Sequence, residues 1–419
     1  MHILYLHQHF ALPSGSTGTR SYEFARRWVA QGHRVTIITG SYDLGGYPIK
    51  NKLFDYLSID GIDVHIVGIR YSNKQSYVAR ILAFTSFMIL CTWIALKVRQ
   101  VDIVFATSTP LTIGIPAVIT KWWKHIPFVF EVRDQWPAVP IGMGIIRATW
   151  LIPFLQLLEK WIYYHADGII ALSPGMEEGI RAVLEVPRPI AMVPNSSDTS
   201  LFHPEIDGKF LRMQRNWENK CVFLHFGTIG VANGIDMLVE VADHLRAEKD
   251  IYFVILGDGN QRKSIQEKIT ERKLDNIEII ASRPKSELPN YVAACDVSIV
   301  CFAPHPILQD NSANKFFDSL SAGKPILLNY SGWQRELLES HRAGFGVDQG
   351  NIEEFVSKVC WYRDNREVLL DMGRRSRILA EQYFNRDDLA GRVLEVLLAM
   401  CGYNTRYPRP RSNNVSAYS

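Results

Sequence analysis

Cysteine is scarce in this sequence and follows no recognisable metal or disulfide pattern. Six cysteines occur among 419 residues, and no two of them stand in a Cys-x-x-Cys arrangement. The two nearest, Cys295 and Cys301, are separated by an apolar stretch. Since zinc sites and disulfide frameworks depend on regular cysteine spacings, we expect neither, and the pattern suits a reducing compartment.

The sequence also lacks an excess of charge of either sign. Lys and Arg number 46, and Asp and Glu number 43, which leaves a formal net charge of +3. A protein that binds nucleic acid by neutralising its phosphates needs a larger basic excess, so we expect no nucleic acid partner. Hydrophobic residues make up 47% and charged residues 21%, as in ordinary globular proteins, so the chain as a whole is not disordered.

No uncharged, strongly apolar run reaches the roughly 20 residues that a membrane helix needs. The best candidate, residues 81–96, contains Thr85, Ser86 and Thr92. The opening residues MHILYLHQHF show no basic segment followed by a long apolar core, so we expect no signal peptide. The sequence therefore predicts a cytoplasmic protein and leaves contact with a membrane surface open.

The first forty residues have the pattern of a β-loop-α-β unit. Residues 3–6 form a short apolar run that suits a buried parallel strand. A loop rich in Gly and Ser follows at 13–19, and apolar residues then recur at helical spacing between 22 and 29. Gly32 stands where a helix would end, and residues 34–39 are typical of a second strand. This order is the start of a doubly wound sheet.

A chain of this length holds two or three domains, and its remaining strands fall into two series. Polar residues 196–220 separate the series. The expected strands of the first series are residues 64–67, 103–106, 128–132 and 168–172. Those of the second series are residues 222–226, 252–256, 277–280, 297–300 and 325–328, with helices at 236–245 and 262–271.

The sequence thus predicts an α/β protein with two Rossmann-like, doubly wound domains that face a central cleft at the carboxyl ends of their strands. The expected divisions are an N-terminal domain at 1–195, a linker at 196–220, a C-terminal domain at 221–385, a C-terminal helix at 386–401 that packs back on the N-terminal domain, and a disordered tail at 402–419.

One segment of the second series combines two carboxylates with a cation. We expect Asn311 or Ser312 to cap a helix that ends at Gly323, with Asp310 just before the helix and Asp318 roughly 12 Å along its axis. Free N–H groups at the helix start, with Lys315 one turn along, suit a phosphate. Two carboxylates that flank an anion site match a sugar nucleotide. A capped surface helix with solvated charges fits the same residues equally well.

The segment also resembles the acidic-x7-acidic motif of retaining glycosyltransferases of family 4, which have the two-domain GT-B fold. Asp310 and Asp318 hold the two acidic positions, and Ser-Leu-Ser-Ala-Gly-Lys-Pro follows them. Residues 102–111 and 132–137 resemble a branch that makes bacterial surface polysaccharides such as O-antigen or capsule. Further matches occur in the expected order at residues 15–20, 31–36, 172–176, 194–198, 256–259 and 286–296.

This resemblance implies roles for individual residues. It gives Asp318 the ribose hydroxyls, Asp310 the donor sugar and the charge near its anomeric carbon, and Lys315 the departing diphosphate. It implies nucleotide-sugar binding by Asp318, Asn311, Ser312, Ala313, Asn314, Gly227, Thr228, Arg283, Gly15 and Gly18. The family usually has Glu at both acidic positions and a basic pair after the first strand of the second domain, where this chain has Thr228 and Asn233.

The N-terminal domain supplies the expected acceptor site, with Arg20, Arg133 and His9 as acceptor-binding residues. Asp134 ends a buried strand on the cleft side and could position or deprotonate an acceptor hydroxyl, which makes it the third catalytic candidate beside Asp310 and Lys315. An internal pair of Arg133 and Asp134, and a structural role for His9, are open alternatives. Turn chemistry alone could likewise explain the glycines at 15 and 18.

Two apolar segments of the N-terminal domain suit a membrane surface. Residues 68–100 carry no acidic residue and five basic ones, namely Arg70, Lys74, Arg80, Lys97 and Arg99. Residues 139–164 form a second apolar stretch that includes Trp150 and Trp161. Cation-flanked apolar surface suits an anionic leaflet, and buried core helices are the alternative.

The resemblance implies a retaining glycosyltransferase that needs no metal ion and no resident cofactor. Such an enzyme moves a sugar, with an N-acetylated amino sugar as a candidate, from a UDP-sugar to a glycan on a polyprenyl diphosphate. Such an enzyme would be peripheral on the inner face of the plasma membrane. Two alternatives remain: a UDP-sugar epimerase on the same fold, and a catalytically degenerate protein that binds a glycan or a partner. A nicotinamide enzyme fits poorly, because the first βα loop has no clean G-x-G-x-x-G.

Overall fold

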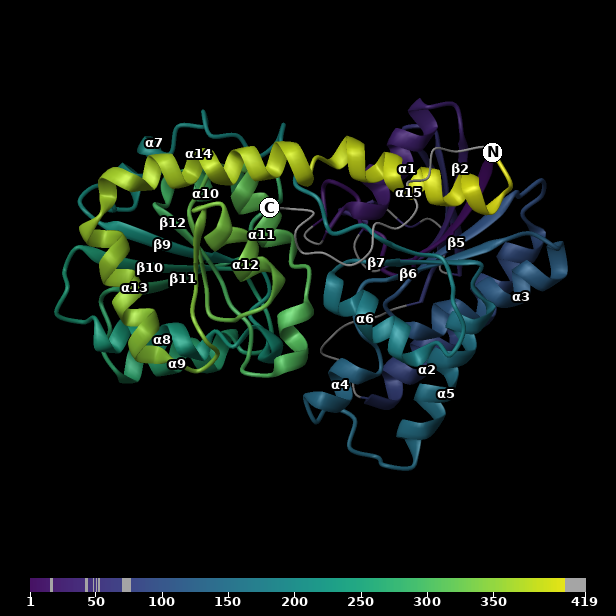
Figure 1. The fold of residues 1–419 in the computed structure, drawn as a ribbon, viewed down its shortest axis with the longest axis horizontal. Helices are drawn as coiled ribbons and strands as arrows, with labels where there is room; N and C mark the ends of the chain where they lie inside the picture. Colours follow the sequence, from purple (N-terminus) through teal and green to yellow (C-terminus); the bar gives the residue numbers. More distant parts are fainter. Residues whose placement is uncertain are drawn as a thin grey trace. The chain divides into compact units, whose positions relative to one another are not determined.

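The computed structural model describes residues 1–15, 18–41, 44–47, 49, 51, 53–69 and 77–403, with only the backbone for residues 77, 78 and 80. The chain forms two compact units: residues 1–194 together with the helix that begins at Arg386, and residues 195–385. Each unit is a parallel sheet covered by helices (Figure 1). The predicted α/β class with two Rossmann-like domains is confirmed. The predicted disordered tail lies, from residue 404 onward, outside the described residues.

The first unit contains an eight-stranded sheet in the order β3-β4-β2-β1-β5-β6-β7-β8. Its strands are β1 (His2–Leu6), β2 (Arg34–Gly40), β3 (Phe54–Ile59), β4 (Ile62–Val67), β5 (Ile103–Thr107), β6 (Phe128–Val132), β7 (Gly168–Ala171) and β8 (Ile190–Met192). All neighbours are parallel except β3, which pairs antiparallel with β4. The strand order reverses direction at β1, as the sequence predicted for a doubly wound sheet.

Strand β3 is an element that the sequence analysis did not predict. It joins β4 through the two-residue turn Asp60-Gly61, in which both residues have positive φ. Asp-Gly is the strongest short sequence signal for such a hairpin. The strand was missed because its burial is only partial, and its mixture of apolar and polar residues lacks the apolar run by which the other strands were found.

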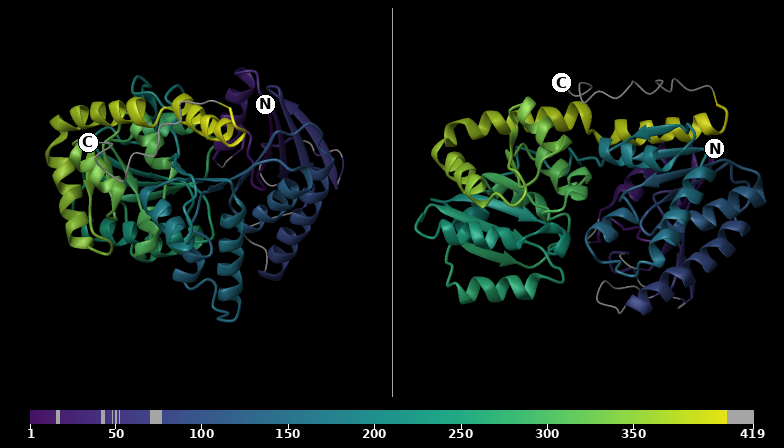
Figure 2. Two further views of the ribbon diagram at one scale, coloured as in Figure 1. Left: turned by 45° about the vertical axis from the view of Figure 1, so that its right-hand side comes forward. Right: turned by 60° about the horizontal axis from the view of Figure 1, so that its bottom comes forward.

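Helices cover both faces of this sheet, because its strands direct apolar side chains to each face. Helices α1 (Arg20–Ala30) and α15 (Arg386–Met400) lie side by side on one face (Figures 1 and 2). The other face packs against α2 (Tyr77–Lys97), α3 (Gly114–Lys124), α5 (Leu151–His165) and α6 (Pro174–Val183). The short helices η1 (Leu111–Ile113) and α4 (Ala138–Gly142) lie in loops that follow the carboxyl ends of β5 and β6.

The second unit contains a six-stranded, wholly parallel sheet in the order β11-β10-β9-β12-β13-β14. Its strands are β9 (Cys221–Phe226), β10 (Ile251–Leu256), β11 (Ile277–Ile280), β12 (Val297–Val300), β13 (Ile326–Leu328) and β14 (Gly344–Gly346). Its helices are α7 (Lys209–Gln214), η2 (Val231–Asn233), α8 (Asp236–His244), α9 (Arg262–Glu271), α10 (Leu288–Ala294), η3 (Pro306–Asp310), α11 (Asn314–Ser321), α12 (Trp333–Ser340), α13 (Ile352–Asp364) and α14 (Arg366–Tyr383).

Residues 196–220 are not a free linker. They belong to the second unit, where Phe202 and Trp217 are buried with side chains of β9 and β10. The polar composition of the segment hid these two anchors, because a few large side chains contribute much of the apolar area that such a segment buries. The chain passes between the units at Pro194–Asn195 and again at Asn385–Arg386.

Candidate functional site

In the second unit the strand order reverses beside β9, and the carboxyl end of β9 carries an unusual group of residues. The chain leaves β9 through Gly227, whose φ is +127°. A Cβ at that position would lie 3.3 Å from Cε of Lys315 in α11. The glycine therefore lets the lysine side chain lie against the backbone at the end of the strand. Gly257, after β10, touches Gly227 so closely that a Cβ there would lie 1.8 Å from the Gly227 carbonyl oxygen.

The ammonium group of Lys315 lies 3.2 Å from Nε2 of His225, a buried residue of β9. Burial, and then the charge of Lys315, hold the pKa of His225 well below its usual value, so the imidazole is neutral and accepts the hydrogen bond. Burial lowers the pKa of Lys315 to about 8. Among the described residues, no carboxylate lies within ion-pair distance of Lys315. The arrangement leaves a cation at the strand end without a counterion.

Asp310 precedes the helix, as predicted, but the helix begins later than expected, so Asp318 lies nearer its start. Asp310 ends the short helix η3, and α11 begins only at Asn314. Asp318 lies one turn into α11 and is 5% exposed. The predicted cap is also wrong, because the residue before the helix is Ala313, which makes no side-chain cap.

Asn195 explains why Ser312 does not cap α11. The Ser312 hydroxyl accepts the backbone N–H of Asn195 at 3.1 Å, and the Ser312 carbonyl oxygen accepts the Asn195 side-chain amide at 2.5 Å. Both residues are buried. The sequence analysis attached no function to Asn195, yet it fixes the strand-like segment that leads into α11. That segment and the uncapped start of α11 bring Asn311, Ser312, Ala313 and Asn314 close to Lys315 along the chain.

Two other predicted donor-site residues lie in exposed loops. Thr228 follows Gly227 directly and is exposed. Arg283 follows β11, forms a 4.0 Å ion pair with Glu287, and is exposed. Because β11 lies two strands from β9, Arg283 emerges roughly 10 Å to the side of Gly227. The structure therefore brings Gly227 and Lys315 together and leaves Arg283 apart from them.

In the first unit, polar residues gather where β1, β5 and β6 end. Nη1 of Arg133, after β6, lies 3.2 Å from Nε2 of the buried His7, after β1. Since a guanidinium only donates, His7 accepts there, and its other ring nitrogen lies 2.9 Å from the hydroxyl of Ser21. Asp134 accepts a 3.0 Å hydrogen bond from the Thr109 hydroxyl, not from Arg133. The open alternative of an Arg133–Asp134 pair is thus not what the structure has.

Arg133 has no carboxylate within ion-pair distance among the described residues, so this strand edge also presents a cation without a counterion. His9 lies nearby and is partly buried. Burial, together with the charge of Arg133, lowers the pKa of His9 to about 4. His9 is therefore neutral at pH 7, as His7 is.

Arg20 has a structural role instead of the predicted acceptor contact. Its guanidinium donates to Glu131 at 2.8 and 3.0 Å and to the carbonyl oxygens of Val193 and Pro194. Arg20 and Glu131 are both buried, and Glu131 also accepts the Thr107 hydroxyl at 2.6 Å. A buried cation needs hydrogen-bond acceptors around it, and these acceptors are protein groups. The guanidinium of Arg20 therefore directs its N–H groups at the protein itself.

The glycine-rich loop before α1 is described only in part. Gly15 is buried and closes a turn with Leu12 through a 2.8 Å backbone hydrogen bond. Gly18 is half-buried, and residues 16 and 17 lie outside the described part of the chain. The turn accounts for Gly15, and a contact of either glycine with substrate stays a prediction.

Sequence reasoning missed His225, Asn195 and Glu131 as contributors to these strand edges. It allowed His7 a place in the cleft but favoured a structural role for it. A signal existed for two of them. His225 and Glu131 interrupt otherwise apolar strands, and a buried polar residue needs a partner. Their partners are far away in sequence, 90 residues in the case of Lys315 and 111 in the case of Arg20, so the sequence could not name them.

Two further observations concern metals and membranes. Among the described residues, no group of three or more His, Cys, Asp or Glu side chains could hold a metal ion. None of the described helices combines the length and the apolar character that a bilayer crossing requires.

Family models match both units. A model of glycosyl transferase 4-like domains matches residues 15–196, and a model of glycosyl transferases group 1 matches residues 209–379. A Pseudomonas aeruginosa protein named as a probable glycosyltransferase, WbjE, is 24% identical over 261 residues, which cover 61% of this chain and 64% of that protein. An Escherichia coli (strain K12) protein named as a candidate colanic acid biosynthesis glycosyl transferase, WcaI, is 26% identical over 183 residues. These residues cover 41% of this chain and 44% of WcaI. The chain therefore spans less than two thirds of the length of either relative.

Solved structures share the fold across nearly the whole chain. Sucrose-phosphate synthase from Thermosynechococcus elongatus superposes with a TM-score of 0.74 at 15% identity and covers 95% of this chain and 99% of that one. Anabaena HepE in complex with UDP-glucose superposes with a TM-score of 0.70 at 16% identity and covers 95% of this chain and 100% of that one.

Proposed function

The chain belongs to the glycosyltransferases of the GT-B fold, and from this premise we propose that it transfers a sugar from a UDP-sugar to a lipid-linked glycan in the synthesis of bacterial surface polysaccharide. The observation that carries the proposal is the Lys315 ammonium group. It is held between Gly227 and a neutral His225 where the strand order reverses, without a carboxylate partner among the described residues. Such a cation suits the diphosphate of a sugar nucleotide.

In the proposed reaction, the bond between the anomeric carbon and the diphosphate oxygen breaks and UDP leaves with the electron pair. Lys315 and the start of α11 stabilise the negative charge that develops on UDP. Asp310 binds the donor sugar and supports the positive charge near the anomeric carbon, and Asp318 binds the ribose. The acceptor oxygen then bonds to the same face of the sugar, so the configuration is retained.

The first unit would bind the acceptor. Asp134 positions the attacking hydroxyl and takes its proton, and Arg133 binds a phosphate of the polyprenyl diphosphate carrier. The guanidinium of Arg133 is already oriented by His7, and Asp134 is oriented by Thr109. In this scheme the positive charges of the protein neutralise the diphosphate, and the reaction needs no metal ion.

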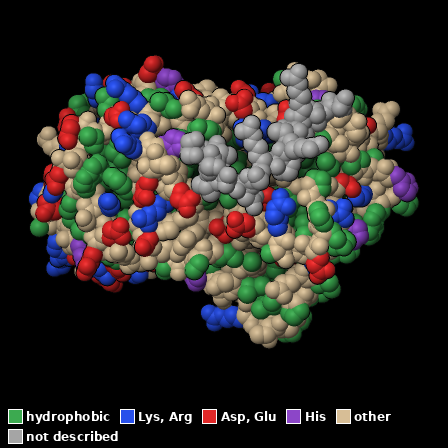
Figure 3. All heavy atoms as spheres, in the orientation of Figure 1, with side chains coloured by type: hydrophobic (Ala, Val, Ile, Leu, Met, Phe, Trp, Pro, Cys, Tyr) green, Lys and Arg blue, Asp and Glu red, His purple; other side chains and the backbone are tan. Residues whose placement is uncertain are grey.

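A lipid-linked acceptor requires the enzyme to reach a bilayer, and α5 supports this part of the proposal. Trp150 is 79% exposed, Phe154 62% and Leu157 65%. Hydrophobic side chains gather on the surface of the first unit where Figure 1 places α4 and α5 (Figure 3). Contiguous exposed apolar and aromatic side chains are typical of a surface that meets a partner or a membrane. The inner sides of α2 and α5 pack in the core, as the alternative of buried core helices predicted, and contact of their outer sides with a membrane stays part of the proposal.

A thermal-stabilisation screen with UDP-, GDP- and dTDP-sugars tests the donor. A ligand present at 100 times its dissociation constant stabilises the folded state by about 2.7 kcal/mol, which raises the melting temperature measurably. We expect a UDP-sugar to give the largest shift, and Lys315→Met to abolish it. Lys263→Met is the matched control, because Lys263 is an exposed lysine of the same unit.

Two outcomes would contradict the proposal. If no UDP-sugar stabilises the wild-type protein, or if Lys315→Met responds like the control, the diphosphate does not bind where we place it. Conversion of the free UDP-sugar to its epimer without any acceptor would favour the epimerase instead.

A further inference from the structure

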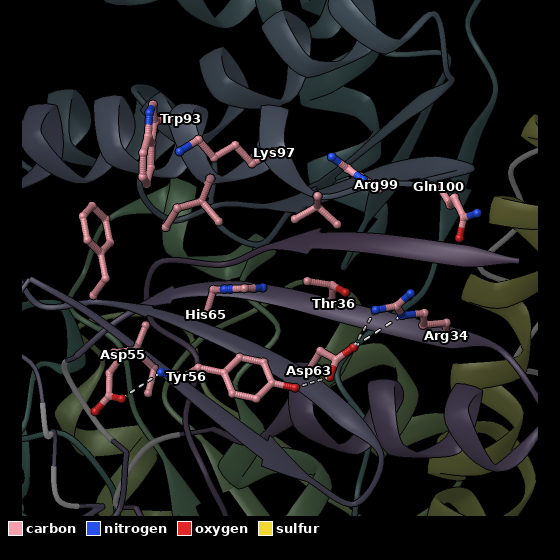
Figure 4. A pocket seen from close by; sticks show the side chains of 14 residues that line it. Arg34, Thr36, Asp55, Tyr56, Asp63, His65, Trp93, Lys97, Arg99 and Gln100 are labelled. Atoms are coloured by element: carbon pink, nitrogen blue, oxygen red, sulfur yellow. Dashed lines mark hydrogen bonds and ion pairs between the residues drawn. The ribbon is translucent and has the colours of Figure 1, made fainter.

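A cavity of about 590 Å³ opens in the first unit between the C-terminal half of α2 and strands β2, β3 and β4 (Figure 4). Arg34 at the start of β2 and Gln100 just after α2 line one end of it. Arg34 stands at the amino end of β2, and Gly40 ends the strand six residues on, roughly 20 Å away. Since the proposed acceptor site lies at the carboxyl ends of the strands, this cavity is a separate place in the fold.

Aromatic rings form two walls of the cavity. Trp93 of α2 stacks on Phe54 of β3 with ring centroids 5.3 Å apart. Tyr56 meets the ring of His65 edge-on at 5.5 Å. Burial lowers the pKa of His65 in spite of the nearby Asp63, so this wall is uncharged at pH 7. The volume and the apolar walls are those of a site for a small organic molecule.

Cations line the rim of the cavity, and two of them have no counterion among the residues that the structure describes. Arg34 is paired with Asp63 at 3.3 Å, and Asp63 also accepts the hydroxyl of Tyr56. The ammonium group of Lys97 lies 3.3 Å above the Trp93 ring, and Arg99 follows two residues later. Within the part of the chain that the structure describes, no carboxylate lies within 4 Å of the Lys97 or Arg99 charge.

The one other carboxylate that lines the cavity does not balance these charges. Asp55 accepts the backbone N–H of Tyr56 at 2.9 Å and lies on β3, across the cavity from α2 (Figure 4). The Trp93 ring holds the Lys97 ammonium group at the rim through a cation–π contact, which leaves the charge in place for an anion. An anionic group at the rim would thus find two cations, while an apolar group below it would find aromatic walls.

We propose that this cavity binds an anionic amphiphile: a phosphate or carboxylate head held by Lys97 and Arg99, with one apolar chain between Trp93 and Tyr56. The outer side of α2 leads into the cavity, because Leu82, Ile89 and Trp93 are exposed and fall on one stripe at helical spacing. A membrane lipid or a free single-chain amphiphile would present the same chemistry. The inference does not depend on the proposed transferase reaction.

Calorimetric titration with monomeric dodecyl phosphate tests the site. We expect one molecule to bind per chain, and dodecyl maltoside and inorganic phosphate to bind at least 10-fold more weakly, because each satisfies only half of the site. The double variant Lys97→Gln/Arg99→Gln and the single variant Trp93→Ala should each weaken binding of dodecyl phosphate at least 10-fold. Lys263→Gln/Arg374→Gln, which removes two exposed cations of the second unit, is the matched control and should bind normally.

Competition with vesicles distinguishes the two sources of the ligand. If vesicles of anionic phospholipid displace dodecyl phosphate, the natural ligand is a membrane lipid. If they do not, it is a free amphiphile, and the site stands in either case. Equal binding by the wild type, the double variant and Trp93→Ala, or no binding of dodecyl phosphate by the wild type, would overturn the proposal. Circular dichroism of each variant, together with Trp93→Phe, separates loss of the site from loss of the fold.

Discussion

Nζ of Lys315 and Nε2 of His225 lie 3.2 Å apart, although the two residues are 90 positions apart in the sequence. A lysine ammonium group has no acceptor, so the imidazole must accept and must be neutral. Burial of both groups reinforces this arrangement, because it lowers the pKa of each. His225 thereby orients the cation without cancelling its charge, as a carboxylate would.

The pH dependence of catalysis should report the charge of Lys315. Because its pKa is lowered to about 8, the side chain is charged below that pH and becomes neutral as the pH rises through it. We expect kcat/KM for the nucleotide sugar to fall above pH 8, since kcat/KM reports ionisations of the free enzyme. Lys315→Met should lower kcat by about 100-fold, the scale for one stabilising group.

Lys315→Arg is the informative control, because arginine keeps its charge at every pH used. Its profile should be flat between pH 7 and 10 even if its rate is lower. An unchanged alkaline limb in that variant would mean that another group causes the fall.

Asp318 should contribute to nucleotide binding. We expect Asp318→Ala to weaken binding of UDP by about 10-fold in a calorimetric titration, because a carboxylate is a strong acceptor for ribose hydroxyls. Asp318 is buried, so the melting temperature of the variant must be compared as well. Asp371→Ala, which removes an exposed carboxylate of α14, is the control and should bind UDP like the wild type. Unchanged affinity in a folded Asp318→Ala protein would reject the role.

The buried pair of Arg20 and Glu131 should matter for stability and not for acceptor affinity. Removing one partner of a buried ion pair leaves an uncompensated charge and costs about 3–5 kcal/mol. We expect Arg20→Met and Glu131→Leu to lose about this much in denaturant unfolding, and the double variant to lose less than the sum. The KM for the acceptor should stay within about 2-fold.

An exposed pair supplies the comparison. Lys249→Met removes a surface contact with Asp275 and should cost at most about 1 kcal/mol. A stable Arg20→Met protein with a strongly raised acceptor KM would restore the acceptor-binding role that the sequence suggested for Arg20.

The apolar surface of α5 should bind anionic vesicles. We expect Trp150→Ser/Phe154→Ser/Leu157→Ser to lower vesicle binding at least 10-fold in co-sedimentation, because each side chain contributes about 1.5–3 kcal/mol when it leaves water. The variant should still bind monomeric dodecyl phosphate, since the cavity under α2 is intact. Phe210→Ser/Leu370→Ser/Ile378→Ser removes three exposed apolar residues of the second unit and should sediment like the wild type.

The sequence predicted the fold well where burial is complete. Residues 128–132, 277–280 and 297–300 are strands with the predicted bounds, because short and mostly apolar runs between turns are typical of a parallel sheet, even though each run contains one polar residue. It failed for β3, a partly buried strand that mixes apolar and polar residues, and for residues 196–220, where Phe202 and Trp217 anchor a polar segment.

The site was predicted in outline and not in geometry. The segment with Asp310, Lys315 and Asp318 was found from its residue types alone. Its helix begins later than predicted because Ser312 binds Asn195, a contact between residues 117 positions apart. Serine is a favourable N-cap residue, so the local sequence favoured a cap at Ser312. In the structure its hydroxyl instead accepts a buried tertiary hydrogen bond and does not cap the helix.

The amino-acid sequence by itself determined the α/β class, the strand runs and the family to which the chain belongs, since these follow from local hydrophobic periodicity and from the order of short motifs. Only the tertiary structure decided which charges are free to meet a ligand. Arg20, Arg133 and Lys315 are three basic residues that the sequence analysis assigned to binding or catalysis. Glu131 neutralises the first of them, while neutral histidines hold the other two. That difference arises because a buried cation is stabilised by whichever distant group the fold places beside it.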